Sequence, residues 1–537
     1  MLFNKITPER AGIKSASVKK YLDFVERRQI PLHSLIMMHG EDIFCEAYWA
    51  PYNEKSNHRM YSQTKSFVSI AIGLLQEEGK LSLDDRIADH FPEMIEKPLP
   101  EFLQRLTIEE MLKMSTAGFA QSWFSNYCES RTHFYFNSDK IALHPSGTLW
   151  GYDSAGSQVL ASLVEKLSGM SLFDYLTEKV FKYLGTFKGA EILKTRNNDS
   201  WGDSALLCTT RDMASFARFV MNYGKWNGKQ LLNEAYLRKA TSPLISNKHH
   251  YRTYAFDYGY GYQIWCTERD GFAFVGMGNQ LTVCLPKDNL IFTCTADCQN
   301  DDGIAREQLL NAFYDFIVYD KSDSPLPEND SDYSALEATM SNRELFCIKG
   351  SATSPIKDEI DGKTYFCEPN QMGITEFTFK FDSDDAGTLE YVNEQGRKEL
   401  KFGINRNEFG KFPQLGYSNE HGGAKTTDGF MYNDAVSMTW IDEHQIMIYV
   451  QIIDKYLGNT VMNFAFRDDF ATVQMTKVAE AFLNEYSGHT VARRKQNKKQ
   501  RISSLLFFFN HQNRTSQCRA GNICPLGQGA HRVSHAR

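Results

Sequence analysis

The sequence lacks a paired-cysteine motif and a long apolar run. Its eleven cysteines are odd in number and include no Cys-x-x-Cys spacing, which argues against a disulfide framework and a zinc site. Such thiols are typical of a reducing compartment. No stretch is apolar enough to cross a membrane, and Met1–Lys5 enters a polar segment without a signal-peptide core. We therefore expect a cytoplasmic protein that needs no metal or organic cofactor.

The folded body also lacks a positive charge balance. The net charge is −7, but residues 487–537 carry ten Lys or Arg and no Asp or Glu, so the remaining chain stands at −17. An acidic body argues against nucleic acid as the main partner, because phosphate binding needs a basic surface. The basic tail, 488–537, has no hydrophobic periodicity and is predicted to be disordered. A surface-binding arm and readthrough of a stop codon are the alternatives for it.

With 537 residues, the chain is long enough for two or more domains. Residues 1–320 predict an α+β domain, in which an antiparallel sheet flanked by helices joins the two ends of the region and a helical subdomain lies between them. The predicted strands of this sheet cover 32–39, 43–49, 260–265, 272–276, 281–285 and 290–295. Residues 321–341 predict a Pro-containing linker. Alternating short strands over 342–487 predict a β-rich barrel or sandwich.

Ser62 and Lys65 form a Ser-x-x-Lys motif at the start of an apolar helical pattern. One helical turn separates the two side chains, so the amine lies beside the hydroxyl. A buried lysine has a lowered pKa and can take the serine proton, which makes Ser62 a candidate nucleophile. The motif is weak by itself, because Ser17–Lys20 and Ser354–Lys357 also match it.

The surroundings of Ser62 add weight to the motif. Tyr61-Ser62-Gln63-Thr64-Lys65-Ser66-Phe67 is followed by Gly79-Lys80-Leu81-Ser82-Leu83-Asp84-Asp85, and Tyr152-Asp153-Ser154 lies downstream. This succession resembles the serine β-lactamase-related and penicillin-binding-protein-like family. The family includes class C β-lactamases, D-alanyl-D-alanine carboxypeptidases, esterases and 6-aminohexanoate-dimer hydrolase. The resemblance covers about residues 6–320 and implies a β-lactamase/transpeptidase-like fold.

The resemblance also implies roles for the later motifs. Tyr152 would share the proton of Ser62 and pass it to the leaving group, and Ser154 would bind Lys65 and a substrate amide. A third motif falls at 275–280, where the substrate and oxyanion-binding candidates are Gly276, Gly278, Asn279 and Gln280. A backbone N–H near Asn279 or Gln280 would complete the oxyanion hole. The family often has a cation in this segment, and this chain has none.

The sequence therefore predicts a serine hydrolase that cleaves a small ester, amide or peptide through an acyl-enzyme on Ser62. A non-catalytic or slow-turnover penicillin-binding-type sensor is the alternative, motivated by the degenerate third motif. A structural or partner-binding protein is a second alternative. Lining of the cleft and packing in the core are the two alternatives for the aromatic residues Trp123, Phe124, Tyr127, Phe134 and Tyr135. The substrate and the oligomeric state are not predicted.

Overall fold

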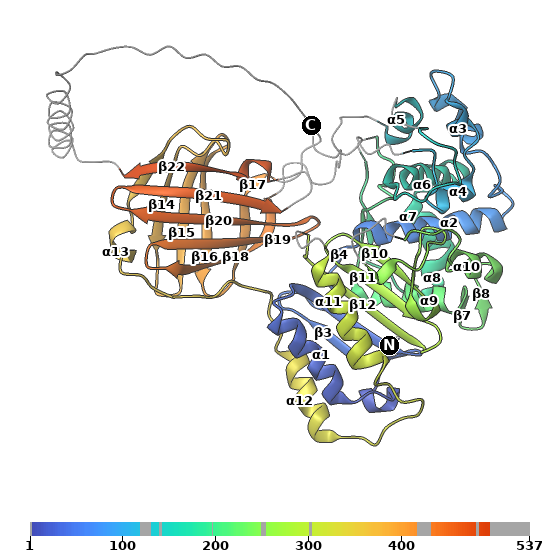
Figure 1. The fold of residues 1–537 in the computed structure, drawn as a ribbon, viewed down its shortest axis with the longest axis horizontal. Helices are drawn as coiled ribbons and strands as arrows, with labels where there is room; N and C mark the ends of the chain where they lie inside the picture. Colours follow the sequence, from blue (N-terminus) through green and yellow to red (C-terminus); the bar gives the residue numbers. More distant parts are fainter. Residues whose placement is uncertain are drawn as a thin grey trace, which may run out of the picture.

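The computed structural model describes residues 3–118, 130–138, 142–195, 197–248, 254–299, 303–415, 431–478 and 483–494. Figure 1 shows a mixed α and β part, from which a β-barrel extends on one side. Cys45, Cys208, Cys266, Cys284 and Cys294 are buried and free. Within the described ranges, none of the helices has the length and apolarity needed to cross a membrane, and no three His, Cys, Asp or Glu side chains group as a metal site.

A seven-stranded sheet joins the two ends of the first domain, as the sequence predicts. Its order is β1-β3-β2-β12-β11-β10-β9. The central pair is antiparallel, with Leu35 of β2 opposite Cys294 of β12. The strands span Asn4–Lys5 (β1), Asp42–Tyr48 (β3), Leu32–His39 (β2), Leu290–Ala296 (β12), Gln280–Leu285 (β11), Gly271–Gly276 (β10) and Trp265–Thr267 (β9). The prediction of a strand over 260–265 is wrong, since β9 begins only at Trp265. At Gly261 the chain passes close to Ala240, and a Cβ on this glycine would lie 2.0 Å from the Ala240 carbonyl oxygen.

Helices cover both faces of this sheet. On one face α1 (Ser15–Arg27) buries its apolar stripe, and the ring of Tyr21 meets Phe292 of β12 edge-on with centroids 6.0 Å apart. α11 (Ile304–Phe313) lies beside it. On the other face lie α2 (Thr64–Glu77) and α9 (Thr210–Met221). The helical subdomain, with α6 (Ser154–Ser168) against α2, continues from there (Figure 1).

The second domain is a β-barrel. Its strands are Thr364–Cys367 (β13), Glu376–Phe381 (β14), Ala386–Asn393 (β15), Gly396–Ile404 (β16), Glu408–Leu415 (β17), Met431–Asp442 (β18), Gln445–Ile453 (β19), Leu457–Arg467 (β20), Phe470–Val478 (β21) and Gly488–Arg494 (β22). They form a ladder that runs from β16 through β13, β22 and β20 to β18. A parallel pairing of Gly403 with Ser437 then joins β16 to β18 and closes the barrel.

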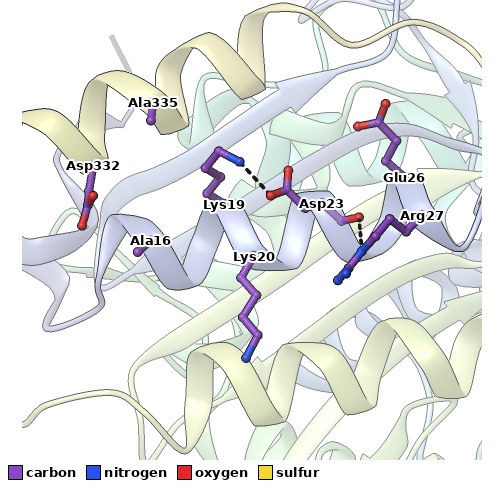
Figure 2. Close-up of a pocket in the computed structure, with 8 residues that line it drawn as sticks. All are labelled: Ala16, Lys19, Lys20, Asp23, Glu26, Arg27, Asp332 and Ala335. Carbon is purple, nitrogen blue, oxygen red and sulfur yellow. Dashed lines mark hydrogen bonds and ion pairs between the residues drawn. The ribbon is translucent and has the colours of Figure 1, made fainter.

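Two predicted boundaries need correction. The expected linker contains α12 (Asp330–Ser341), which packs Leu336 into the core beside α1. The groove between α1 and α12 carries charged side chains, including the ion pair of Lys19 and Asp23 at 2.7 Å (Figure 2). The expected disordered tail begins with β22, which pairs with β13 and β21. Alternating burial of Thr490 and Ala492 explains this strand, and residues 495–537 lie outside the described ranges.

Candidate active site

Ser62 lies in a short 3-10 turn, Tyr61–Gln63, that leads directly into α2. Its side chain is partly exposed, whereas Gln63, Thr64 and Lys65 are buried. The hydroxyl of Thr64 donates to the carbonyl of Tyr61 at 2.6 Å and accepts from the Leu206 N–H at 3.0 Å. Tyr61 has φ +46°, a left-handed conformation that non-glycine residues rarely adopt. Such strain is often kept at functional positions.

Lys65 meets the predicted geometry of a general base. Its Nζ donates to Ser62 Oγ at 3.0 Å and to the backbone carbonyl of Asp203 at 2.7 Å. The side chain is 1% exposed. Burial lowers the pKa of Lys65 to about 8, while the charges of Asp203 and Asp153 oppose this shift. An amine with this pKa is about one-tenth neutral at pH 7, and the neutral amine accepts a proton.

Tyr152 also contacts Ser62. It hydrogen-bonds Ser62, and its pKa is raised, chiefly by burial. Its ring centroid is 5.0 Å from Lys65 Nζ and its ring stacks on Trp265 with a centroid distance of 5.7 Å. The structure thus brings together all three predicted catalytic side chains.

Asp153, between the two predicted residues of the second motif, caps the N-terminus of α6. Its carboxylate accepts from Gly156 N–H at 3.0 Å and from Thr116 Oγ1 at 2.9 Å, and burial raises its pKa. Ser154 is the first residue of α6. In the described part of the chain no hydrogen bond joins Ser154 to Lys65, whose donors go to Ser62 and Asp203. A contact between Ser154 and a substrate amide stays a prediction.

The third motif forms the turn between β10 and β11. Gly276 pairs with Gln280 across the turn, and both Gly278 and Asn279 have positive φ. A Cβ on Gly276 would lie 2.2 Å from the Met60 carbonyl oxygen, so the turn runs against the segment that leads to Ser62. Met277 is exposed, whereas Asn279 and Gln280 are buried.

The Gln280 side chain holds the turn together. Its Nε2 donates to the carbonyls of Met277 at 2.9 Å and Ala296 at 2.7 Å, and its Oε1 accepts from Ala296 N–H at 3.1 Å. These bonds use the amide internally, so the side chain of Gln280 positions the turn. Whether a backbone N–H of the turn faces a substrate oxyanion stays a prediction.

Sequence reasoning missed three charged residues around this site. Asp203 is fully buried, with Oδ2 3.9 Å from Lys65 Nζ and Oδ1 3.8 Å from Arg131 Nη1. Neither carboxylate oxygen accepts a hydrogen bond from the described residues. Arg131 lies over the Trp201 ring at 4.3 Å. Arg306 of α11 donates to Asn279 Oδ1 at 3.4 Å, and its charge lowers the pKa of Tyr152. No local motif marks any of the three.

The remaining sequence candidates lie elsewhere. Ser17 Oγ donates to Asp320 at 3.2 Å on the surface, and Ser354 Oγ donates to the Glu443 carbonyl at 2.5 Å in the barrel domain. Tyr135 is fully buried and belongs to the core. The aromatics at 123, 124 and 127 fall outside the described residues.

Comparisons with known proteins concern the family of this chain. A family model described as Beta-lactamase matches residues 18–311, more than half of the chain. An uncharacterized protein of Alkalihalophilus pseudofirmus is 24% identical over 280 residues, which cover 47% of this chain and 76% of that protein. The 6-aminohexanoate-dimer hydrolase of Paenarthrobacter ureafaciens is 21% identical over 294 residues, covering 51% of this chain and 75% of the relative. The octameric penicillin-binding protein homologue from Pyrococcus abyssi matches with a TM-score of 0.46 and 15% identity over 88% of this chain and 98% of its own.

Proposed function

Because this chain belongs to the beta-lactamase family and is a hydrolase, we propose that it is a serine hydrolase whose nucleophile is Ser62. Lys65 acts as the general base and Tyr152 carries the proton to the leaving group. The observation that carries the proposal is the meeting of these side chains: Lys65 Nζ lies 3.0 Å from Ser62 Oγ, and Tyr152 hydrogen-bonds the same serine.

The proposed acylation begins with neutral Lys65. Its Nζ takes the proton of Ser62 while Oγ forms a bond to the carbonyl carbon of an ester or amide, and the carbonyl π electrons move to oxygen. When the tetrahedral intermediate collapses, the bond to the leaving group breaks, and Tyr152 gives its proton to that group and takes one from the Lys65 ammonium. Water then bonds to the acyl carbon and gives a proton to neutral Lys65. The bond from that carbon to Ser62 Oγ breaks, and Oγ takes the proton back from Lys65 as the acid leaves. A pKa of about 8 suits Lys65 for this task, since a base works best with a pKa near the operating pH.

The oxyanion needs donors that are fixed before the reaction. The Ser62 N–H, at the start of α2, is one candidate. A backbone N–H of the turn 276–280 is the second, and the packing of Gly276 against Met60 supports this assignment. Ser154, Gly276, Gly278 and Asn279 line the proposed substrate side. The substrate class proposed is a small ester or amide, which fits the hydrolase relative.

Labelling with a fluorophosphonate, followed by mass spectrometry of the modified peptide, tests the nucleophile. We expect one label on Ser62 and none in Ser62→Ala. Ser17→Ala is a matched control, because Ser17 also precedes a lysine by three residues but lies on the surface. A label on another residue of active protein would refute the assignment.

The second candidate is a slow-turnover binding protein that acylates and then stops. The absence of a cation from 275–280 favours it. The progress curve of p-nitrophenyl ester cleavage separates the two. Sustained turnover beyond one equivalent, lost in Ser62→Ala, supports the hydrolase. A burst of one equivalent without a following steady state supports the binding protein.

A further inference from the structure

The turn of the β19–β20 hairpin, which belongs to the barrel, reaches into the first domain beside Ser62. Tyr456 in this turn is fully buried. Its ring lies 4.4 Å from the guanidinium of Arg59, which also lies over Tyr61 at 4.6 Å and Trp201 at 4.7 Å. Arg59 is itself fully buried, so rings from both domains enclose one cation three residues before the proposed nucleophile.

The backbone of the same hairpin is bonded from two directions. The N–H of Leu457 donates to Tyr61 Oη at 3.3 Å, and its carbonyl accepts from Gln299 Nε2 at 2.9 Å. Tyr61 directly precedes Ser62, whereas Gln299 lies just beyond β12. One barrel residue therefore connects the nucleophile segment with the end of the central sheet.

A third contact strengthens the link to the sheet. Asn459 Nδ2 donates to the buried Asp297 Oδ2 at 3.0 Å. The neighbouring Cys298 N–H donates to the carbonyl of Gly278 at 3.1 Å, so the segment that the barrel contacts also supports the third-motif turn. Buried polar contacts of this kind fix geometry more firmly than exposed ones.

We infer that Tyr456, Leu457 and Asn459 of the barrel are positioning residues of the proposed active site. They hold the segment Arg59–Ser62 and the turn 276–280 in fixed relation. The inference rests on the proposed function, because it assigns these residues to the reactivity of Ser62. Tyr61 needs such support, since its backbone is in a strained conformation that persists only where the surroundings hold it.

The test measures the limiting rate of fluorophosphonate labelling at saturating probe in the full-length chain, well below the thermal unfolding midpoint. Tyr456→Ala removes the ring over Arg59 and should lower this rate about ten-fold or more, because small displacements of a nucleophile have large kinetic effects. Tyr456→Phe keeps the ring and should restore the rate to within about two-fold of wild type. A purely structural role would lower the unfolding midpoint and leave the limiting rate unchanged.

Lys455→Ala is the matched control. Lys455 is the neighbouring residue, and its ion pair with Glu191, at 2.7 Å, is partly exposed on both sides, so its loss should matter little. If Tyr456→Ala does not fold, Asn459→Ala takes its place and should also slow labelling while Lys455→Ala does not.

The outcomes separate the two hypotheses. Wild-type rates in folded Tyr456→Ala, or in Asn459→Ala when the first variant does not fold, overturn the positioning role and leave the proposed function intact. A wild-type chain that is active but not labelled at Ser62 overturns the proposed function and this inference with it.

Discussion

Replacing Asp203 by asparagine tests whether this buried carboxylate sets the basicity of Lys65. The substitution keeps the shape of the side chain and the backbone carbonyl that binds Lys65, but it removes a negative charge 3.9 Å from the amine. At an effective dielectric constant of about 20, a unit charge at this distance stabilises the ammonium form by about 4 kcal/mol at most. That corresponds to an upper limit of about three pKa units.

The sign of the effect follows from the charge. Asp203 raises the pKa of Lys65 against the lowering effect of burial, so its loss lets the pKa fall below about 8. A lower pKa leaves a larger fraction of Lys65 neutral at pH 7. The acid limb of the rate profile should therefore move to lower pH, by up to about three units. The plateau should fall, because a weaker base abstracts the proton less readily.

The assay is the pH dependence of kcat/KM for a p-nitrophenyl ester between about pH 5.5 and 9.5. Asp199→Asn is the control from the same loop. Its carboxylate accepts from Asn197 Nδ2 at 2.6 Å and shares the charge of Arg131 with Asp203, but it is not among the charges that act on Lys65. An acid limb that stays in place in Asp203→Asn, or moves to higher pH, would refute the reasoning. If Asp203→Asn is less stable than wild type but the acid limb of its pH–rate profile does not move, Asp203 has a structural role only.

Three further predictions concern the turn 276–280 and its support. Gly276→Ala places a Cβ 2.2 Å from the Met60 carbonyl oxygen, so it should cost at least about 2 kcal/mol of stability and most of the ester cleavage, measured by urea unfolding and initial rates. Gln280→Met leaves buried backbone groups of Met277 and Ala296 without partners and should destabilise the chain by about 2–4 kcal/mol in the same urea assay; an unchanged midpoint would contradict it. Burial raises the pKa of Asp297 to about 6, so in the folded state its ionisation is unfavourable. The protonated carboxyl therefore stabilises the fold below the unfolded pKa, and this stabilisation is lost as pH rises through about 6. Relative to wild type, the free energy of unfolding of Asp297→Asn should rise by up to about 3 kcal/mol between about pH 4 and 7. Parallel curves of stability against pH for the two proteins would contradict this prediction.

The proximity of Ser62 and Lys65 could be predicted from the sequence because one helical turn limits their separation. Ser62 and Lys65 are three residues apart at the start of an apolar helix, a spacing that allows two side chains to meet. The spacing does not ensure contact, because Ser17, three residues before Lys20 in α1, donates to Asp320 instead. The central sheet was also predictable, since β2, β3, β11 and β12 are short segments rich in apolar residues and bounded by turns. The prediction of a strand over 260–265 failed because the aromatic residues of that segment are buried in a loop. An apolar sequence pattern indicates burial, and it does not distinguish a buried loop from a strand.

The linker and the tail were mispredicted for a related reason. The segment 321–341 is rich in Pro and charged residues, yet it contains a helix that packs Leu336 into the core, with Tyr333 and Met340 against the same core. Basic residues after Gly488 conceal a strand that pairs on both sides within the barrel. In both cases the decisive interactions are made with partners distant in sequence, which local composition does not report.

The missing cation of the third motif shows how far absence can mislead. The segment 275–280 carries no Lys or Arg, yet Arg306 from α11 binds Asn279 and acts on Tyr152 through its charge. An electric field depends on position in space and not on the strand that supplies the charge. A motif that is present ties residue types to one another through backbone geometry, so its presence is informative. The absence of a charged residue from a motif shows only that this segment does not supply the charge. A neighbouring element in the fold can supply it instead.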